Sequence, residues 1–354
     1  MKTNIIQLLI HLSVMLSWLF IPTMAQDIGA NYMQIGFIGA SYGIAIFLSS
    51  YIFGRASDMY RRKEFIILGL GLCSVSFLLQ IFATDVVSLL LLRFIAGFTV
   101  GICTAPLISY VFETGGNIGK LSSYGSLGWA FGTILAGIIA VYWQLFTLSS
   151  IFFLIAFILS LSLPKSKHRR MSIPLFPKDV IRRNFRVYFA CFLRNTGAHS
   201  IWAIFPIFLL DLGATKFWIG VIYFLNSGLQ VIFMRFMDRY PDKILINFGL
   251  LVSTFVFIFY SLTTNYSQIL FLNIFLALSW SSLYVGSLLY MAHRNEERAT
   301  SIGMLTSVIS ISAAFGPILG GIVSQLFGFR EVMLLAGILS FSGFFISITR
   351  NRNP

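Results

Sequence analysis

The stretch Asp27-Ile-Gly-Ala-Asn-Tyr-Met-Gln-Ile-Gly36 recurs 184 residues later as Asp211-Leu-Gly-Ala-Thr-Lys-Phe-Trp-Ile-Gly220. Each copy lies between two long apolar segments and follows the first apolar segment of its part of the chain. A similarity that arose by chance would not be expected at the same topological position in both parts of the chain. Since self-similarity at a fixed offset is the mark of a repeated structural unit, we predict two related halves.

The composition requires lipid as the solvent for most of the chain. Of the 354 residues, 57% are hydrophobic and 10% are charged, and the mean hydropathy is +0.86. A helix needs roughly 20 apolar residues to cross a bilayer. Twelve such stretches are predicted, at 4–25, 33–54, 65–83, 86–111, 121–142, 144–163, 186–210, 216–237, 243–263, 267–292, 299–326 and 330–349. The first lacks a small-x-small cleavage site, which favours a membrane span over a removed signal.

The basic residues set the orientation. With the N-terminus inside, 21 of the 25 Lys and Arg residues fall on the inner side, and only Lys216 and Arg330 fall in outer loops. The positive-inside rule therefore predicts a multi-pass protein of the cell membrane with both termini in the cytoplasm. This placement also accounts for the net charge of +13, so no nucleic-acid partner is expected. A basic, proline-containing linker at 164–185 would separate the halves 1–163 and 186–354.

Two motifs carry a resemblance to a known family. Gly54-Arg-Ala-Ser-Asp58-Met-Tyr-Arg61-Arg62-Lys63 is similar to the loop motif G-x-x-x-D-R-x-G-R-R/K of the major facilitator superfamily, with Met59 and Arg61 as departures. Arg93-x3-Gly97 in the fourth span resembles the family motif R-x-x-Q-G, with Ala96 replacing glutamine. The resemblance covers the whole chain. It implies an all-α polytopic membrane protein of twelve helices, arranged as two pseudo-symmetric six-helix bundles, that moves a small solute by alternating access.

The resemblance also implies a gate on the cytoplasmic side, in which Arg62 pairs with Glu113 at the inner end of the fourth span. Asp58 could face the positive end of the eleventh span, and Asp238 belongs to a degenerate copy of the loop motif in the second half. We predict a charge clasp that holds the outward-open state. The alternative is that the basic residues only obey topology. The predicted gating residues are Gly54, Asp58, Arg62, Lys63, Glu113 and Asp238.

Polar residues at membrane depth mark the predicted binding site. A charge at mid-span costs at least about 2.5 to 3.5 kcal/mol on insertion scales, so it usually indicates a cavity or a partner. Asn195 in the polar stretch 194–199 is the repeat equivalent of His11, and first helices of both halves line the central pathway in this family. Pairs four residues apart share a helix face. The candidates are His11, Ser17, Arg93, Arg194, Asn195, His199, Asn226, Gln230, Trp280 and Tyr284. Arg93 could instead be structural, and the two aromatic residues core filling.

The charges at membrane depth suggest a solute class. Every Asp and Glu falls in a loop or at a span end, whereas Arg93 and Arg194 lie within spans. This imbalance favours an organic anion, and a coupling proton would have to use His11 or His199. The expected partners are a small-molecule substrate and the lipid bilayer, and the chain is expected to be a monomer without cofactor or metal.

Two other function classes remain open. A transporter-like membrane solute sensor would share all of these features. A membrane-embedded enzyme would need a catalytic cluster at depth, which the sequence does not suggest, so no enzyme activity is expected.

Overall fold

The computed structural model describes residues 1–354 except 60, 116–117, 165–177, 238, 296–297 and 349–354. Secondary structure in the described residues is entirely helical. The N half contains α1 (Lys2–Trp18), α2 (Ile21–Asp27), α3 (Tyr32–Met59), α4 (Arg62–Leu79), the 3-10 helix η1 (Gln80–Phe82), α5 (Val86–Glu113), α6 (Ile118–Ile139) and α7 (Tyr142–Leu161). The C half contains α8 (Lys178–Trp202), α9 (Phe205–Asp211), α10 (Lys216–Met237), α11 (Asp242–Ser261), α12 (Tyr266–Arg294), α13 (Arg298–Leu326) and α14 (Phe329–Ile348).

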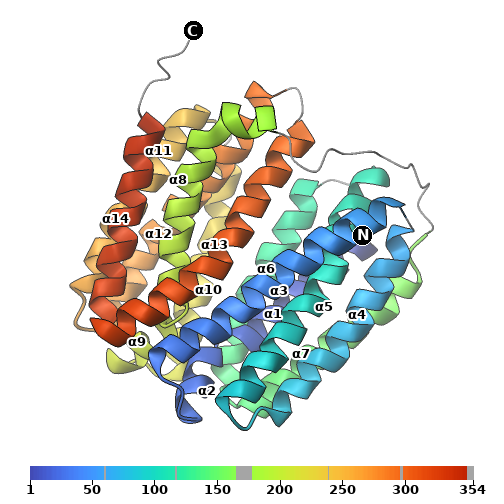
Figure 1. The fold of residues 1–354 in the computed structure, drawn as a ribbon, viewed down its shortest axis with the longest axis horizontal. Coiled ribbons are helices and arrows are strands. Elements are labelled where there is room, and N and C mark those ends of the chain that lie inside the picture. Colours follow the sequence, from blue (N-terminus) through green and yellow to red (C-terminus); the bar gives the residue numbers. More distant parts are fainter. Residues whose placement is uncertain (60, 116–117, 165–177, 238, 296–297, 349–354) are drawn as a thin grey trace.

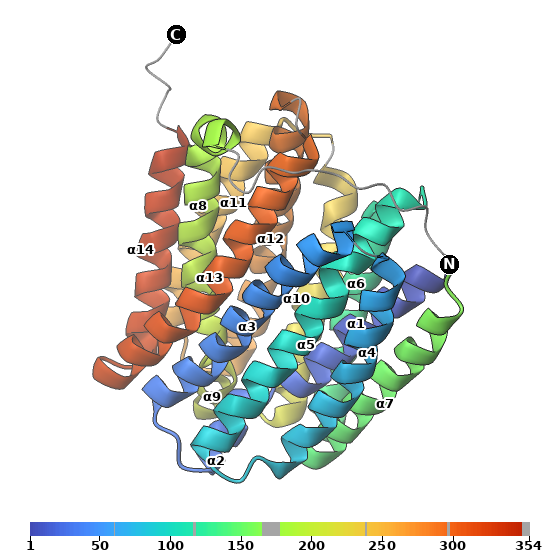
Figure 2. The same cartoon turned by 45° about the vertical axis from the view of Figure 1, so that its right-hand side comes forward.

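The predicted fold class is confirmed, because these helices form twelve spans in two bundles that stand side by side (Figures 1 and 2). Within the described residues, ten spans are long and apolar enough to cross a membrane on their own. The other two, α6 and α8, are not in that set. Gly and Ser dilute the apolar residues of α6, and α8 begins with basic residues and also contains Arg194.

Two predicted spans are broken rather than continuous. The first is divided into α1 and α2, and the seventh into α8 and α9, with Pro22 and Pro206 in the first turn after each break. A proline lacks the N–H that would bond to the carbonyl four residues earlier, so the helix is interrupted after Trp18 and after Trp202. In addition, α8 begins at Lys178, eight residues before the predicted start at 186.

Glycine pairs bring the two halves into contact. The halves meet where α3 packs on α13 and where α6 packs on α10. A Cβ on Gly137 would lie 2.8 Å from the Cα of Gly220, and a Cβ on Gly321 would lie 2.9 Å from the Cα of Gly36. These contacts are equivalent under the repeat, since the 184-residue offset relates Gly137 to Gly321 and Gly36 to Gly220. Backbones can approach this closely only where side chains are absent.

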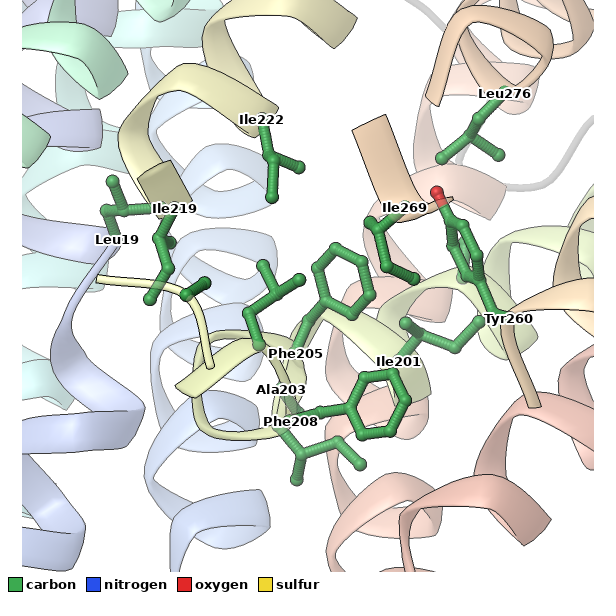
Figure 3. Close-up of a cluster of buried hydrophobic side chains, with 14 of the residues drawn as sticks. Leu19, Ile201, Ala203, Phe205, Phe208, Ile219, Ile222, Tyr260, Ile269 and Leu276 are labelled. Carbon is green, nitrogen blue, oxygen red and sulfur yellow. The ribbon is translucent and has the colours of Figure 1, made fainter. Parts of the chain in front are cut away.

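One end of the molecule is closed by contacts between the halves. We call it the outer face, after the predicted orientation; it carries α2 and α9, at the bottom of Figure 1. There Lys216 Nζ donates to Tyr142 Oη (3.2 Å), and the Tyr142 hydroxyl donates to Asp27 Oδ2 (2.6 Å). The Tyr32 backbone N–H donates to Gln325 Oε1 (3.0 Å). A buried apolar cluster behind these contacts includes Leu19 of the N half together with Phe205 and Tyr260 of the C half (Figure 3).

Candidate solute-binding site

Arg194 lies inside the C half and is held by neutral groups. Its side chain is only 4% exposed. Nε donates to Ser253 Oγ (2.9 Å) and Nη1 donates to Asn195 Oδ1 (3.3 Å). The guanidinium lies over the rings of Trp280 (5.0 Å) and Phe257 (5.4 Å). Among the described side chains no carboxylate forms an ion pair with it, so its charge is stabilised by dipoles and aromatic faces alone.

Trp280 and Tyr284 extend this group along α12. Their rings stack with centroids 5.3 Å apart at 23°, and both side chains are partly exposed. Asn195 is fixed from behind, because its Nδ2 donates to the Cys191 carbonyl (2.8 Å). The structure therefore brings four of the predicted binding residues together, namely Arg194, Asn195, Trp280 and Tyr284. We call them the Arg194 group.

Asn226 and Gln230 lie between α10 and α12. Gln230 Nε2 donates to Asn226 Oδ1 (2.6 Å), and Asn226 Nδ2 donates to the Asn273 carbonyl (3.4 Å). Both side chains are buried, and the bond from Asn226 to Asn273 links the two helices. Their described contacts do not join them to the Arg194 group.

Arg93 occupies a separate, enclosed position in the N half. Its Nη1 donates to Gln80 Oε1 (3.1 Å) and to Ser17 Oγ (3.3 Å), and its guanidinium lies 4.2 Å from the ring centroid of Tyr42. Ser17 also donates to Gln80 Oε1 (3.1 Å). With 1% exposure, Arg93 ties α1, α3 and η1 to α5. The two arginines predicted for one site thus lie in different halves, with separate partners.

The two histidines lie at equivalent helix contacts of the two halves. His11 packs on α6, with Gln7 Nε2 2.8 Å from its Nε2 and the Trp129 ring 5.6 Å away. His199 packs on α13, where a Cβ on Gly316 would lie 2.4 Å from the His199 Cβ. Both rings are partly buried, and no described contact joins them to each other.

The predicted gating residues are described in part. Arg62 Nη2 lies 3.2 Å from Glu113 Oε1, and Lys63 Nζ donates to the carbonyls of Leu161 (2.8 Å) and Leu163 (2.6 Å). Gly54 packs near Ala105. All of these contacts lie within the N half, so they do not by themselves link the halves. The Asp58 side chain and Asp238 lie outside the described residues, and the gating role stays a prediction.

The sequence interpretation missed an aromatic cluster beside the helix breaks. The Tyr223 ring lies 6.3 Å from Trp18 of the other half and 5.6 Å from Trp202. Phe205 contacts Tyr223 (6.0 Å) and Tyr260 (5.3 Å). A signal was available, because the offset that relates Asp27 to Asp211 also relates Trp18 to Trp202 and Pro22 to Pro206.

Two surface pockets lie away from the Arg194 group, one of about 380 Å³ beside Tyr142 and one of about 470 Å³ beside Thr263. We place the candidate site at the Arg194 group rather than in these pockets, since neither contains a predicted binding residue. The described residues contain no group of three or more His, Cys, Asp or Glu side chains that could hold a metal.

Comparison with known proteins identifies the family. The model of the Major Facilitator Superfamily matches residues 3–229 and 187–354, so the chain belongs to this superfamily. An uncharacterized MFS-type transporter of Methanocaldococcus jannaschii is 24% identical over 341 residues, covering 89% of this chain and 88% of that protein. Multidrug resistance protein 1 of Bacillus subtilis is 25% identical over 344 residues, covering 90% and 88%.

Solved structures share the fold. A bacterial homolog to the human lysosomal transporter Spinster, in its inward-facing and unoccupied conformation, superposes with a TM-score of 0.82 at 15% identity, covering 98% of this chain and 95% of that one. The nucleoside transporter NupG superposes with a TM-score of 0.80 at 15% identity, covering 99% and 100%. The protein is therefore an MFS transporter by family and by fold.

Proposed function

We propose that this protein is a secondary-active transporter that carries a small organic anion across the cell membrane by alternating access. The observation that carries the proposal is Arg194, a guanidinium at membrane depth that has only neutral partners among the described residues. A guanidinium presents five N–H donors and accepts none, so its best complement is a carboxylate, sulfonate or phosphate.

The surroundings of Arg194 support access by a solute. Its described hydrogen bonds use Nε and Nη1, which leaves the two N–H groups of Nη2 for a ligand. Trp280, which lies against the guanidinium, is partly exposed. A charge-assisted bond in so dry a setting is worth more than one at a surface, because nearby water does not compete for the donor.

The contacts between the halves support alternating access. The outer face is closed by α2, α9 and the Tyr142 hydrogen bonds. This closure is expected for one end state of a motion in which the two halves rock against each other. The glycine contacts of α3 with α13 and of α6 with α10 are smooth surfaces on which two bundles could turn. If transport is coupled to protons, His11 and His199 are the proposed carriers, since histidine ordinarily titrates near neutral pH.

A second candidate solute is a neutral or cationic aromatic compound. Trp18, Trp202 and Trp280 all present partly exposed rings, and aromatic faces attract apolar rings and cations alike. Two of the Bacillus subtilis relatives are named multidrug resistance proteins. For a cation, however, the buried guanidinium of Arg194 would be repulsive, which is why the anion is our first choice.

Three probes of the same shape separate these solutes. Benzenesulfonate is a permanent anion, benzenesulfonamide is neutral near pH 7 and phenyltrimethylammonium is a permanent cation. We expect benzenesulfonate to raise the unfolding temperature of the purified protein and to enter proteoliposomes that contain it. Arg194→Gln should weaken benzenesulfonate binding by about tenfold or more, as expected for the loss of a charge-assisted hydrogen bond.

Arg330→Gln is the matched control, since Arg330 lies at the start of α14 and donates to the Thr263 carbonyl (3.2 Å). It should leave benzenesulfonate binding unchanged. Stabilisation by benzenesulfonamide or phenyltrimethylammonium, without stabilisation by benzenesulfonate, would overturn the anion proposal and favour the second candidate. Binding without flux would instead indicate a solute sensor, and chemical conversion of a bound solute would indicate an enzyme.

A further inference from the structure

Two tyrosines of the C half keep buried hydroxyl groups without a hydrogen-bond partner. The Oη atoms of Tyr223 and Tyr260 are buried, and neither bonds to any described residue. The Tyr260 side chain is 0% exposed. Leaving such a group unpaired is costly, so a phenol kept where a phenylalanine would pack equally well calls for an explanation.

Tyr260 shares one region with Arg194, and the Tyr223 ring adjoins that region. Phe257 contacts both the Arg194 guanidinium (5.4 Å) and the Tyr260 ring (6.5 Å). Phe205 contacts both the Tyr260 ring (5.3 Å) and the Tyr223 ring (6.0 Å). In Figure 3 the Tyr260 hydroxyl points past Ile269 towards Leu276, which is one helical turn from Trp280 of the Arg194 group. The hydroxyl thus points towards the helix that carries Trp280, whose ring lies 5.0 Å from the Arg194 guanidinium.

The chemistry of this region is rich in donors and poor in acceptors. It contains a guanidinium and two phenolic O–H groups, and none of the described salt bridges involves it. A ligand that satisfies all three groups at once must accept several hydrogen bonds, and an anionic oxygen group does so best.

Aromatic rings surround the same region. Tyr223 contacts Trp18 of the N half and Trp202 of the C half, and all three side chains are partly exposed. This cluster joins the two halves, since Trp18 belongs to the N half and Tyr223 and Trp202 belong to the C half. Flat apolar surfaces of this kind favour the ring of an aromatic ligand.

We propose that Tyr223 and Tyr260 are substrate-binding residues and that the substrate is an aromatic anion. Its anionic group accepts hydrogen bonds from Arg194 and the two phenols, and its ring packs on Trp18 and Trp202. This inference rests on the proposed function, and it adds two binding residues and an aromatic body to the solute.

The test uses Tyr→Phe variants of the full-length protein, which remove one oxygen and keep the ring. The dissociation constants of benzenesulfonate and benzenesulfonamide are measured for wild type, Tyr223→Phe and Tyr260→Phe. We expect each variant to bind benzenesulfonate about tenfold more weakly or worse. The unfolding temperature without ligand should stay the same or rise, since an unpaired buried hydroxyl has been removed.

Two tyrosines serve as matched controls. Tyr188 is buried in the C half, but its hydroxyl already donates to the Ser301 carbonyl (2.9 Å). Tyr42 has a buried hydroxyl without a partner, like Tyr260, but lies beside Arg93 in the N half. Tyr188→Phe and Tyr42→Phe should bind benzenesulfonate as the wild type does.

The outcomes separate this inference from the proposed function. If wild type binds benzenesulfonate and Arg194→Gln does not, but both Tyr→Phe variants bind normally, the phenols are not substrate ligands and the anion proposal stands. Equal weakening by Tyr42→Phe would also overturn the inference, because the effect would not be specific to this region. If wild type does not bind benzenesulfonate, both proposals are wrong.

Discussion

Arg93 and Arg194 are both buried arginines without an ion-pair partner among the described residues, yet their surroundings differ. Arg93 is 1% exposed, and its hydrogen bonds and its contact with Tyr42 join helices of the N half. Arg194 is 4% exposed, its described hydrogen bonds reach only Ser253 and the adjacent Asn195, and its guanidinium lies against the rings of Trp280 and Phe257. On the function proposed above, a charge at membrane depth serves packing in one half and recognition in the other.

The largest effect on stability and on ligand binding should come from replacing each of the two arginines in turn. Arg93→Gln should lower the free energy of unfolding by about 2 to 3 kcal/mol, because hydrogen bonds from a charged group are lost and Gln80 and Ser17 stay buried. Arg194→Gln should cost less stability and instead abolish stabilisation by benzenesulfonate. Thermal unfolding with and without the ligand measures both effects. If the two variants behaved alike, the comparison would fail.

Substitutions at the glycine contacts test whether the α6–α10 contact and the α3–α13 contact are equally important for transport. Gly137→Ala would place a Cβ 2.8 Å from the Gly220 Cα, and Gly321→Ala would place one 2.6 Å from the Tyr32 carbonyl oxygen. Overpacking of this kind costs about 1 to 3 kcal/mol, so transport should fall by roughly tenfold in each variant. Proteoliposome flux is the measurement.

Gly228→Ala provides the control for these substitutions. Gly228 lies on α10, as Gly220 does, but nothing lies within 4 Å of its added Cβ. Its flux should equal that of wild type. A defect in only one of the two contact variants would show that the halves turn unequally on their two contacts.

Most of the fold was predictable because the length of an apolar span depends on local sequence. The helix breaks were not. Pro22 and Pro206 interrupt their spans, whereas Pro106 and Pro317 lie inside the continuous helices α5 and α13. A proline removes the same hydrogen bond in each case, and tertiary packing decides whether the helix breaks or continues.

The candidate site was predictable only in part, for a geometric reason. Sequence indicates how deep Arg93 and Arg194 lie along their helices, but not which neighbouring helix each side chain faces. Arg93 faces Ser17 and Gln80, which are distant in sequence, and no periodic pattern connects them. Tyr260 lies near the end of α11, where tyrosine usually marks the membrane interface, so its buried hydroxyl had no signal in the sequence.

A smaller effect should distinguish the repeated aspartates of the outer face. Asp27 accepts the Tyr142 hydrogen bond, whereas Asp211, although exposed by surface area, is desolvated enough by neighbouring atoms to raise the pKa of its carboxyl. A raised folded-state pKa costs stability as pH rises through it, and this cost is absent below the unfolded pKa. Asp211→Asn should therefore raise the unfolding temperature at pH 7, and the gain should shrink towards about pH 4.

Asp27→Asn should lower the unfolding temperature at pH 7, because the asparagine accepts a weaker hydrogen bond from Tyr142. Unfolding temperatures across this pH range test both variants. If Asp211→Asn destabilised the protein at pH 7, the interpretation of its desolvation would be wrong.

The smallest effect on stability should come from the first turns of α5 and α12, where the N half uses an aspartate as the helix cap and the C half uses an asparagine. Asp85 Oδ1 accepts from the backbone N–H groups of Val87 (2.9 Å) and Ser88 (3.0 Å) at the start of α5, and Asn265 Oδ1 accepts from Ser267 N–H (2.9 Å) at the start of α12. The Ser88 backbone hydrogen bond, followed by that of its hydroxyl, lowers the pKa of Asp85. A lowered folded-state pKa gives stability that is present above the unfolded pKa and is lost as pH falls through the folded one.

Only the α5 cap should therefore weaken in acid. Hydrogen exchange, corrected for the intrinsic effect of pH, should show faster exchange at Val87 and Ser88 below about pH 4 and no change at Ser267. Asp85→Asn should make the first turn of α5 insensitive to pH, as Asn265 already makes that of α12, and Asn265→Asp should transfer the sensitivity to α12. If both turns loosened together in Asp85→Asn, the acid effect would be global unfolding, because a cap acts only on the amides it binds.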